Sequence, residues 1–230
     1  MGLTNFRRVE PDTRTPGTVI THGRSHGIFG AIFLGGRRRR VFIRLAVESG
    51  ARPGDAVLDV GCGSGYFTRV LAAAVAPDGT CHGVDPSDEA ISNARRRTRL
   101  ANCTFSDGIA EALDPPDGSY DVVVSSLMIH HLPEDLRPKA IGEMFRVLRP
   151  GGSLLIAEFR PPASRIGRRL IGSLHSPAMA KNRVDLLAAM VREAGFEQLH
   201  SDDLRPSTHY VKAVRPSGAQ PRRAGPKRVG

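Results

Sequence analysis

The sequence predicts an α/β fold, a doubly wound, mostly parallel seven-stranded sheet with helices on both faces. Two observations lead to this prediction. From residue 51 onward, short apolar runs bounded by turn residues alternate with segments of helical periodicity, which is typical of parallel βαβ units. One of these runs, Val122-Val123-Val124, is apolar at every position, as in a strand that is buried on both faces. The chain of 230 residues is long enough for one such core and short for two.

The predicted elements follow one another along the chain with short turns between them. The strands are expected at Ala56–Val60, Thr80–Val84, Cys103–Ser106, Tyr120–Ser125, Ser153–Glu158, Phe196–Leu204 and Tyr210–Val214. The helices are expected at Tyr66–Ala76, Ser87–Leu100 with Ser87 as N-cap, Pro138–Leu148, and Arg183–Ala194 with Gly195 after its last turn.

The composition divides the chain into three parts. Residues 1–50 are predicted to form an N-terminal arm with two helical pieces that cap the functional site, and residues 51–214 the ligand-binding domain. Within that domain, residues 159–181 are a basic, less regular insertion. Residues 215–230 contain Pro, Gly and Arg with little to bury, so we expect a disordered basic tail there.

One glycine-rich segment carries most of the functional information. Asp59-Val60-Gly61-Cys62-Gly63-Ser64-Gly65 runs from a predicted buried strand into a predicted helix. Glycines have no Cβ, so the backbone of such a loop can approach a ligand closely. A dinucleotide-binding loop has the spacing G-x-G-x-x-G and receives a pyrophosphate. Here the glycines alternate and an acid precedes them, which disfavours a diphosphate, suits a cationic amino group and argues against NAD.

Two further acids follow the next two predicted strands. Asp85 ends the second strand, where a carboxylate can accept hydrogen bonds from both ribose hydroxyls of a nucleoside. Asp107, before Gly108, follows the third strand and can accept from the exocyclic amine of adenine. The alternative for each acid, and for Asp59, is a helix cap or a turn residue. Because parallel strands end at one edge of a sheet, we expect the three acids to share that edge.

These segments, together with Asp117–Asp121 and Met144–Gly152, resemble the class I S-adenosylmethionine (SAM)-dependent methyltransferases over residues 51–214. The resemblance implies the Rossmann-like fold of that family, SAM as cofactor, and transfer of its methyl group to an oxygen, carbon or nitrogen. Ile109–Leu113 and Ala157–Phe159 are most similar to the ubiquinone and menaquinone C-methyltransferase branch. That branch implies a small-molecule acceptor, lipid-like or quinone-like, bound between the arm, the loop after the fourth strand and the insertion.

The resemblance also implies which residues hold SAM. Asp59 binds the ammonium group, directly or through water, Asp85 binds the ribose, and Asp107 recognises the adenine amine. The other implied contacts are Gly61, Gly63, Gly65 and the backbone of Ser125 around the methionine part, and Pro86, Gly108 and Ile109 around the adenine. No metal site is expected, because the three cysteines are scattered and lack metal-ligand spacing.

His130 is the candidate catalytic residue. It follows the fourth strand, where this fold lines the acceptor pocket, and a histidine there can take a proton from the acceptor. The alternative is a structural histidine that satisfies backbone groups at the strand end, with His131 facing solvent. Glu158, at the end of the fifth strand, is a comparable candidate. His22 and His26 in the arm are either part of a lid or exposed loop residues.

The net charge of +10 does not by itself indicate a nucleic-acid partner. Seven Lys or Arg and no acid lie between Leu204 and Gly230, and without that stretch the charge is +10 − 7 = +3. Basic tails of this kind are usually solvated. With three Tyr, no Trp and no RNA-binding aromatic signature, the sequence favours a small-molecule acceptor over RNA. An RNA methyltransferase and a non-catalytic SAM- or nucleoside-binding module remain the alternatives.

Two basic and apolar patches bear on the location of the protein. Arg37–Arg40 follows the apolar Ile28–Leu34, and Arg165–Arg169 lies in the insertion. Each is either a solvated face or a point of peripheral contact with an anionic membrane. The first residues lack the apolar stretch of a secretory signal, and the cysteines form no disulfide framework, so a cytoplasmic location is expected. No feature of the sequence predicts an oligomeric state.

Overall fold

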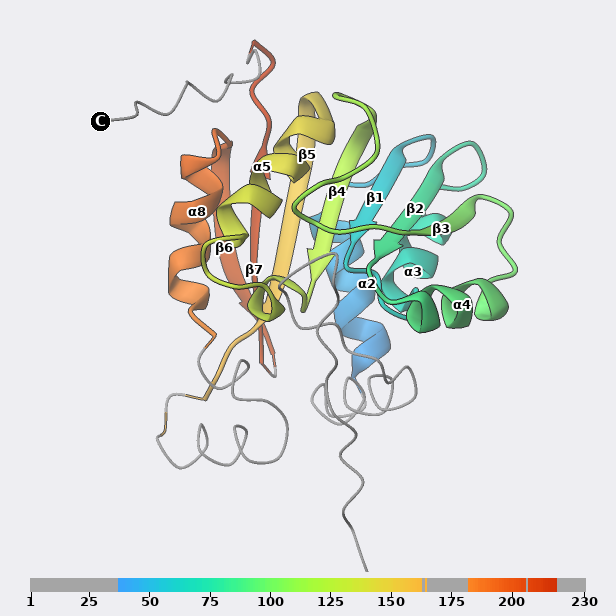
Figure 1. The fold of residues 1–230 in the computed structure, drawn as a ribbon, viewed down its shortest axis with the longest axis horizontal. Helices are drawn as coiled ribbons and strands as arrows, with labels where there is room; N and C mark the ends of the chain where they lie inside the picture. The colour runs from blue at the N-terminus through green and yellow to red at the C-terminus, as the bar shows by residue number, and fades with distance from the viewer. Residues whose placement is uncertain (1–36, 163, 165–181, 206, 219–230) are drawn as a thin grey trace, which may run out of the picture.

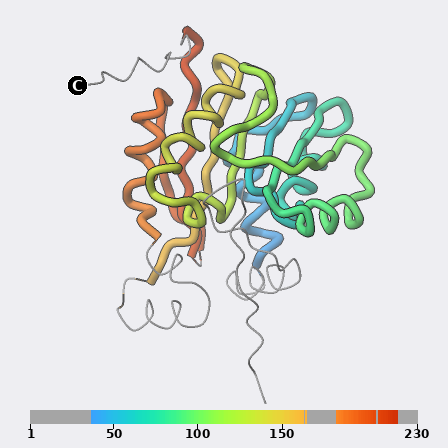
Figure 2. Tube along the Cα trace, in the orientation of Figure 1, coloured from blue at the N-terminus to red at the C-terminus, as the bar shows by residue number. Residues whose placement is uncertain are grey.

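The predicted doubly wound α/β sheet is confirmed. The computed structural model describes residues 37–162, 164, 182–205 and 207–218. Within them, a seven-stranded sheet has the strand order β3-β2-β1-β4-β5-β7-β6. Strands β1 to β5 are parallel, whereas β7 runs antiparallel to both of its neighbours, β5 and β6. Figure 2 shows the chain moving from the blue central strand β1 to one edge of the sheet, and then from β4 to the other.

The strands lie where the sequence predicts them, with differences at their ends. Strand β5 differs most, because it begins at Leu148, opposite Tyr120, and its pairing register shifts before Val122. The turn expected between Leu148 and Ser153 is therefore the irregular start of this strand. The bounds are β1 Ala56–Val60, β2 Thr80–Asp85, β3 Cys103–Asp107, β4 Tyr120–Ser126, β5 Leu148–Phe159, β6 Glu197–Leu204 and β7 Thr208–Val214.

The helices confirm the predicted pattern; α3, α4 and α8 are shorter than predicted, and α5 begins and ends one residue earlier. Ser87 caps α4 as predicted, with its Oγ accepting from the backbone N–H of Ala90 at 3.2 Å. That helix ends at Arg97 because Thr98 is extended. The helix predicted from Arg183 is divided into a 3₁₀ turn and a short α-helix. The bounds are α2 Arg38–Glu48, α3 Tyr66–Val75, α4 Asp88–Arg97, α5 Arg137–Val147 and α8 Leu187–Glu193, with 3₁₀ turns η1 Ile129–His131 and η2 Val184–Leu186.

The helices cover both faces of the sheet, as predicted (Figure 1). One core cluster joins α2, α3 and α4 to one face, and a second joins α5 and α8 to the other. Helix α2 is the second of the two predicted N-terminal pieces, and it is part of the packed domain. Its Phe42 lies 5.1 Å from the ring of Phe67 on α3, measured between ring centroids.

Some predictions concern residues outside the described part of the chain. They are the arm before residue 37 with His22 and His26, the patch Arg165–Arg169, and the tail beyond residue 218. Among the residues that the structure does describe, no helix is long and apolar enough to span a membrane.

Arg215 lies in the packed domain, although the sequence places it at the start of the tail. Only 4% of the residue is exposed, and its guanidinium carbon lies 4.7 Å from the ring centroid of Phe145. Its Nη1 donates to the carbonyl oxygens of Phe145 at 2.9 Å, Arg146 at 3.0 Å, and Leu148. These carbonyls close the C-terminus of α5, where a cation is favourable to the helix dipole.

We expect Arg215→Met to lower the free energy of unfolding by about 2 to 4 kcal/mol, because it leaves buried carbonyls without their donor. Arg205→Met is the matched control, since Arg205 is exposed, and its effect should stay within about 0.5 kcal/mol. Urea unfolding followed by circular dichroism measures both. Equal stabilities of the two variants would show that Arg215 does not hold the end of α5.

Candidate functional site

The candidate site lies at the carboxyl edge of the sheet, where β1 and β4 are neighbours but their chains leave in opposite directions. Open α/β sheets bind ligands at such a switch point. The loop from Gly61 to Gly65 connects β1 to α3 there, and all three of its glycines have left-handed φ angles of +76°, +52° and +71°. Other residues rarely adopt this conformation, so the backbone explains the glycines.

The space around each glycine differs. A Cβ on Gly61 would lie 2.2 Å from Cγ of Met128, and one on Gly65 would lie 2.6 Å from the ring of Phe105. These two glycines therefore also make room for packed side chains of the protein. A Cβ on Gly63 would meet nothing within 4 Å. The backbone at Gly63 is thus open to a ligand, as the sequence predicts for this loop.

Asp59 is completely buried beneath the loop, and only one of its two carboxyl oxygens has a hydrogen-bond partner among the described residues. Its Oδ2 accepts from the hydroxyl of Thr68 at 2.7 Å, whereas its Oδ1 has no hydrogen-bond partner among the described residues. Burial raises the pKa of this carboxyl to about 7; the bond from Thr68 opposes the rise and the nearby Asp85 adds to it. A buried carboxylate oxygen without a donor fits a ligand that carries a cationic amino group.

The titration of Asp59 predicts a pH dependence for the binding of SAM, the cofactor that the resemblance implies. Because a bound ammonium group favours the ionised carboxyl, the affinity should fall as the pH drops below about 7. We expect the dissociation constant to rise roughly tenfold from pH 7.5 to pH 5.5, measured by calorimetry. In Asp59→Asn the affinity should be lower and almost independent of pH. A wild-type affinity that does not change over this range would exclude Asp59 as the partner of the ammonium group.

Asp85 connects the second strand to the glycine loop. Its Oδ2 accepts from the backbone N–H of Gly63 at 2.8 Å, and its Oδ1 accepts from that of Ser87 at 3.0 Å. Burial raises the pKa of this carboxyl, and the two backbone N–H groups oppose the rise. Both oxygens have further lone pairs, so the hydrogen bonds within the protein leave acceptors for ribose hydroxyls.

Asp85 and Asp107 are paired in the register of β2 and β3, so the structure brings these two predicted residues together. Asp59 pairs with Gly83 and therefore lies two residues deeper in the sheet. The predicted row of three acids is thus a pair at the rim with the third buried beneath it. Gly108 follows Asp107 at this rim, and its N–H donates to the carbonyl oxygen of Asp85 at 3.3 Å.

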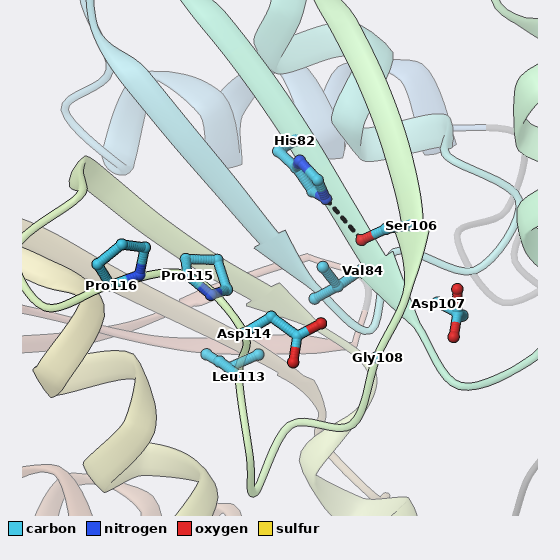
Figure 3. Close-up of a pocket in the computed structure, with 9 residues that line it drawn as sticks. All are labelled: His82, Val84, Ser106, Asp107, Gly108, Leu113, Asp114, Pro115 and Pro116. Atoms are coloured by element: carbon cyan, nitrogen blue, oxygen red, sulfur yellow. Dashed lines mark hydrogen bonds between the residues drawn. The ribbon is translucent and has the colours of Figure 1, made fainter.

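Asp107 and Gly108 also border a half-open pocket of about 430 Å³ (Figure 3). Figure 3 shows side chains of β2 and β3 on one side of it and the loop at residues 113–116 facing them. Nε2 of His82 lies 2.8 Å from the hydroxyl of Ser106, and burial lowers the pKa of this histidine. The remaining lining residues are Val84, Leu113, Asp114, Pro115 and Pro116. The pocket continues the predicted adenine site along the sheet.

The chain turns sharply after β4, beside the glycine loop. Leu127 has a φ of +56°, which is rare for a residue other than glycine, and its N–H donates to the carbonyl oxygen of Ala157 at 2.8 Å. The next residue, Met128, packs against Gly61. Ser125 is fully buried between Val60 and Ile156 of the neighbouring strands, and its hydroxyl has no partner among the described residues. The turn thus brings the η1 residues to the ligand edge.

His130 and Glu158 form a buried pair at this edge. Nδ1 of His130 lies 2.7 Å from Oε2 of Glu158, and each side chain is 2% exposed. The backbone N–H of His130 donates to Oε1 of the same carboxyl at 3.3 Å. The ring of His131 lies 4.0 Å from that of His130, between centroids. The sequence names His130 and Glu158 as separate candidates, and the structure brings them together.

Asn182 is a member of this cluster that the sequence does not reveal. Its side-chain N–H groups donate to Oε2 of Glu158 at 3.0 Å and to the carbonyl oxygen of Phe159 at 2.9 Å. An asparagine next to a basic insertion carries no motif. Its contact with β5 could therefore be found only from the fold.

The residues of the edge fit SAM as a ligand. The open backbone at Gly63, the half-satisfied Asp59 and the rim pair of Asp85 and Asp107 offer space and acceptors, as a cationic nucleoside requires. When bound, SAM supplies an electrophilic methyl group on a positively charged sulfur. Gly65, Pro86, Ile109 and Ser125 lie on the loops and strand ends around these residues. Their individual contacts to SAM stay predictions.

Comparison with known proteins gives the family. A model described as a methyltransferase domain matches residues 57–152. The chain is 30% identical over 188 residues to a ubiquinone/menaquinone biosynthesis C-methyltransferase from Pasteurella multocida, covering 70% of this chain and 69% of that protein. It is 34% identical over 164 residues to an arsenite methyltransferase from Halobacterium salinarum, covering 69% of this chain and 41% of that protein.

A solved structure agrees with the fold. A SAM-dependent methyltransferase from Aquifex aeolicus superposes with a TM-score of 0.67 at 18% identity, covering 84% of this chain and 98% of that one. At this identity the likeness supports the fold alone. The fold, the family model and the curated relatives all agree with the resemblance seen in the sequence.

Proposed function

Because the chain belongs to the class I SAM-dependent methyltransferase family, we propose that it methylates a small-molecule acceptor of the quinone type. In this proposal Asp59, Asp85 and Asp107 hold the cofactor, and His130 is the base that acts on the acceptor. The observation that carries the proposal is the buried pair of His130 and Glu158, which closely follows Met128, the residue that packs against Gly61 of the glycine loop. A base at this edge is useful to an acceptor that must lose a proton before it attacks a methyl group.

The curated relatives suggest two acceptor classes, quinones and arsenite. Arsenite is a soft acceptor that is best held by thiolates, by the preference of soft centres for soft ligands. The chain has three cysteines, Cys62, Cys81 and Cys103, and all are buried in the core cluster beneath α3 and α4. Burial raises the pKa of each thiol, that of Cys103 to about 11. Buried thiols with raised pKa values are poor ligands for arsenite, so they favour the quinone class of acceptor.

Cys81 and Cys103 also lie away from the candidate base, because they stand on β2 and β3 whereas His130 follows β4. All three cysteines, Cys62 of the glycine loop included, pack into the core cluster on the α2, α3 and α4 side of the sheet, whereas Ile129, next to His130, belongs to the cluster on the α5 and α8 side. All three are free thiols, which suits the reducing cytoplasm that we propose as the location of the enzyme.

We further propose a peripheral contact with anionic membranes, which would bring a lipid-like acceptor to the site. Helix α2 supports it with exposed apolar side chains, Ile43 at 38% and Val47 at 66% exposure, on the same stretch of helix as the exposed Arg40 and Arg44. Such a face combines apolar contact with attraction to anionic headgroups. Co-sedimentation with phosphatidylglycerol vesicles and not with phosphatidylcholine vesicles is the expected result. Equal recovery with both would remove the membrane contact.

The acceptor class is tested by incubating the full chain with methyl-labelled SAM and three acceptors: a reduced naphthoquinone, arsenite and total tRNA. We expect labelled product from the quinol alone. A variant with Arg222, Arg223, Lys227 and Arg228 changed to Ser, but with the buried Arg215 kept, controls for the basic tail in the tRNA arm. Labelled arsenic or RNA with no labelled quinol would overturn the proposed acceptor. Labelling of none of a wide acceptor panel would favour a non-catalytic module.

A further inference from the structure

We propose that Glu158 and Asn182 are positioning residues that hold His130 with a free Nε2, so that the attacking atom of the acceptor bears a proton which His130 removes. This inference rests on the proposed function and names the acceptor more closely. It is a molecule with an ionisable O–H or activated C–H, such as a phenol, a hydroquinone or an enol. Acceptors whose attacking atom bears no proton, such as the arsenic of arsenite, are the wrong class for this site.

The charge of Glu158 determines which nitrogen of His130 carries the proton. Burial raises the pKa of this carboxyl, whereas the contact with the His130 ring and the hydrogen bonds from the backbone N–H of His130 and from Asn182 bring the pKa below its ordinary value, and the last two donors act whether the ring is neutral or charged. Glu158 is therefore ionised at neutral pH and can only accept hydrogen bonds. It accepts from the backbone N–H and the ring of His130, and from Asn182. A buried carboxylate with three donors is a well-satisfied charge.

The tautomer of His130 follows from that charge. Since Glu158 has no proton to donate, the 2.7 Å contact requires the proton on Nδ1 of His130. In a neutral imidazole with Nδ1 protonated, Nε2 carries the lone pair. The second bond, from the backbone N–H of His130 to the other carboxyl oxygen, fixes the residue at two points. The ring therefore has one defined orientation and one basic nitrogen.

Asn182 fixes the carboxylate in turn. One of its contacts is to Oε2, the oxygen that also receives the ring of His130, and the other is to the carbonyl of Phe159, next to Glu158 in β5. Its amide thus joins the start of the η2–α8 segment to the end of β5. A carboxylate held by a fixed amide cannot rotate away from the imidazole when the ring becomes charged.

The chemistry balances without a further reactant. Nε2 of His130 takes the proton from the acceptor, and the electron pair of that bond forms the new bond to the methyl carbon. The carbon–sulfur bond breaks with its pair remaining on sulfur. The products are the methylated acceptor, a neutral thioether and one proton on His130, which faces the negative charge of Glu158 and is then released to water. An acceptor whose attacking atom has a lone pair and bears no proton would need none of these groups.

The first test reads the tautomer directly and does not depend on activity. Two-dimensional proton–nitrogen NMR of the histidine rings at pH 8, with His130 assigned by the His130→Ala variant, should show Nδ1 protonated and Nε2 unprotonated. In Glu158→Gln, whose amide can also donate, and in Asn182→Ala the single tautomer should become a mixture. A wild-type ring protonated on Nε2, or an unchanged spectrum in both variants, would overturn the positioning role.

The second test is kinetic and uses a reduced naphthoquinone as the acceptor. We expect Glu158→Gln to lower kcat about 10²-fold with the KM for SAM unchanged, and Glu158→Asp to restore part of the loss. An equal fall for Asp and Gln, with altered circular dichroism, would mean that Glu158 only supports the fold. If the quinol is not methylated but the tautomer result holds, the quinone proposal fails while the positioning role stands.

Discussion

His130→Ala should lower kcat for a protonated acceptor by about 10² to 10⁴-fold, while the dissociation constant for SAM changes less than about twofold. The reason is that the proposed function assigns His130, whose ring is held by Glu158, to the acceptor, whereas the proposed cofactor contacts lie on the glycine loop and the acids. Initial rates with labelled SAM measure kcat, and calorimetry measures the affinity.

His200→Ala is the matched control, because His200 is an exposed histidine on the edge strand β6. His200→Ala should leave kcat and the dissociation constant for SAM unchanged. If His130→Ala loses SAM affinity and turnover together, the residue supports the fold of the edge, and its role as a base is excluded. Retained turnover in His130→Ala would also exclude the role of His130 as a base.

Asp85→Ala should weaken SAM binding by about 100-fold, which corresponds to about 2.7 kcal/mol. Two losses add up in this variant. The ribose hydroxyls lose a charged acceptor, worth about 1.5 to 3 kcal/mol. The N–H groups of Gly63 and Ser87 lose the carboxylate that ties the glycine loop to β2.

The control for Asp85 is Glu89→Ala, which removes an exposed acid from the first turn of α4 and should not change the affinity. Calorimetry with SAM and with its demethylated product measures both variants. An affinity of Asp85→Ala within threefold of the wild type would refute the assignment of the ribose site. A parallel loss of stability, read by thermal unfolding, would point to the loop contact as the larger of the two losses.

The elements of the fold were predictable because each depends on local pattern. The apolar run of β4 and the cap of α4 at Ser87 are examples, and both are confirmed. The antiparallel direction of β7 was not predicted, since a strand direction depends on which neighbour the chain reaches. The start of β5 at Leu148 was missed for a similar reason, because its pairing with Tyr120 overrides the turn residues at Pro150 and Gly151.

The site was predictable at its rim and not in its interior. Asp85 and Asp107 follow strand ends, so their meeting comes from the parallel topology. Asp59 is buried beneath the loop and accepts a hydrogen bond from Thr68 of α3, and no spacing in the sequence gives that contact. The link from Asn182 to Glu158 crosses 24 positions of the chain, and that of Arg215 to Phe145 crosses 70. Contacts of this kind come from tertiary packing.

The central claim is that His130 removes a proton from the acceptor, and a series of phenols and naphthols of graded acidity tests it most directly. Methylation rates are compared at one pH for the wild type and His130→Ala. The ratio of the two rates should be large for acceptors that are protonated at that pH, and should approach one for those that are already ionised. A ratio that stays constant across the series would contradict the claim.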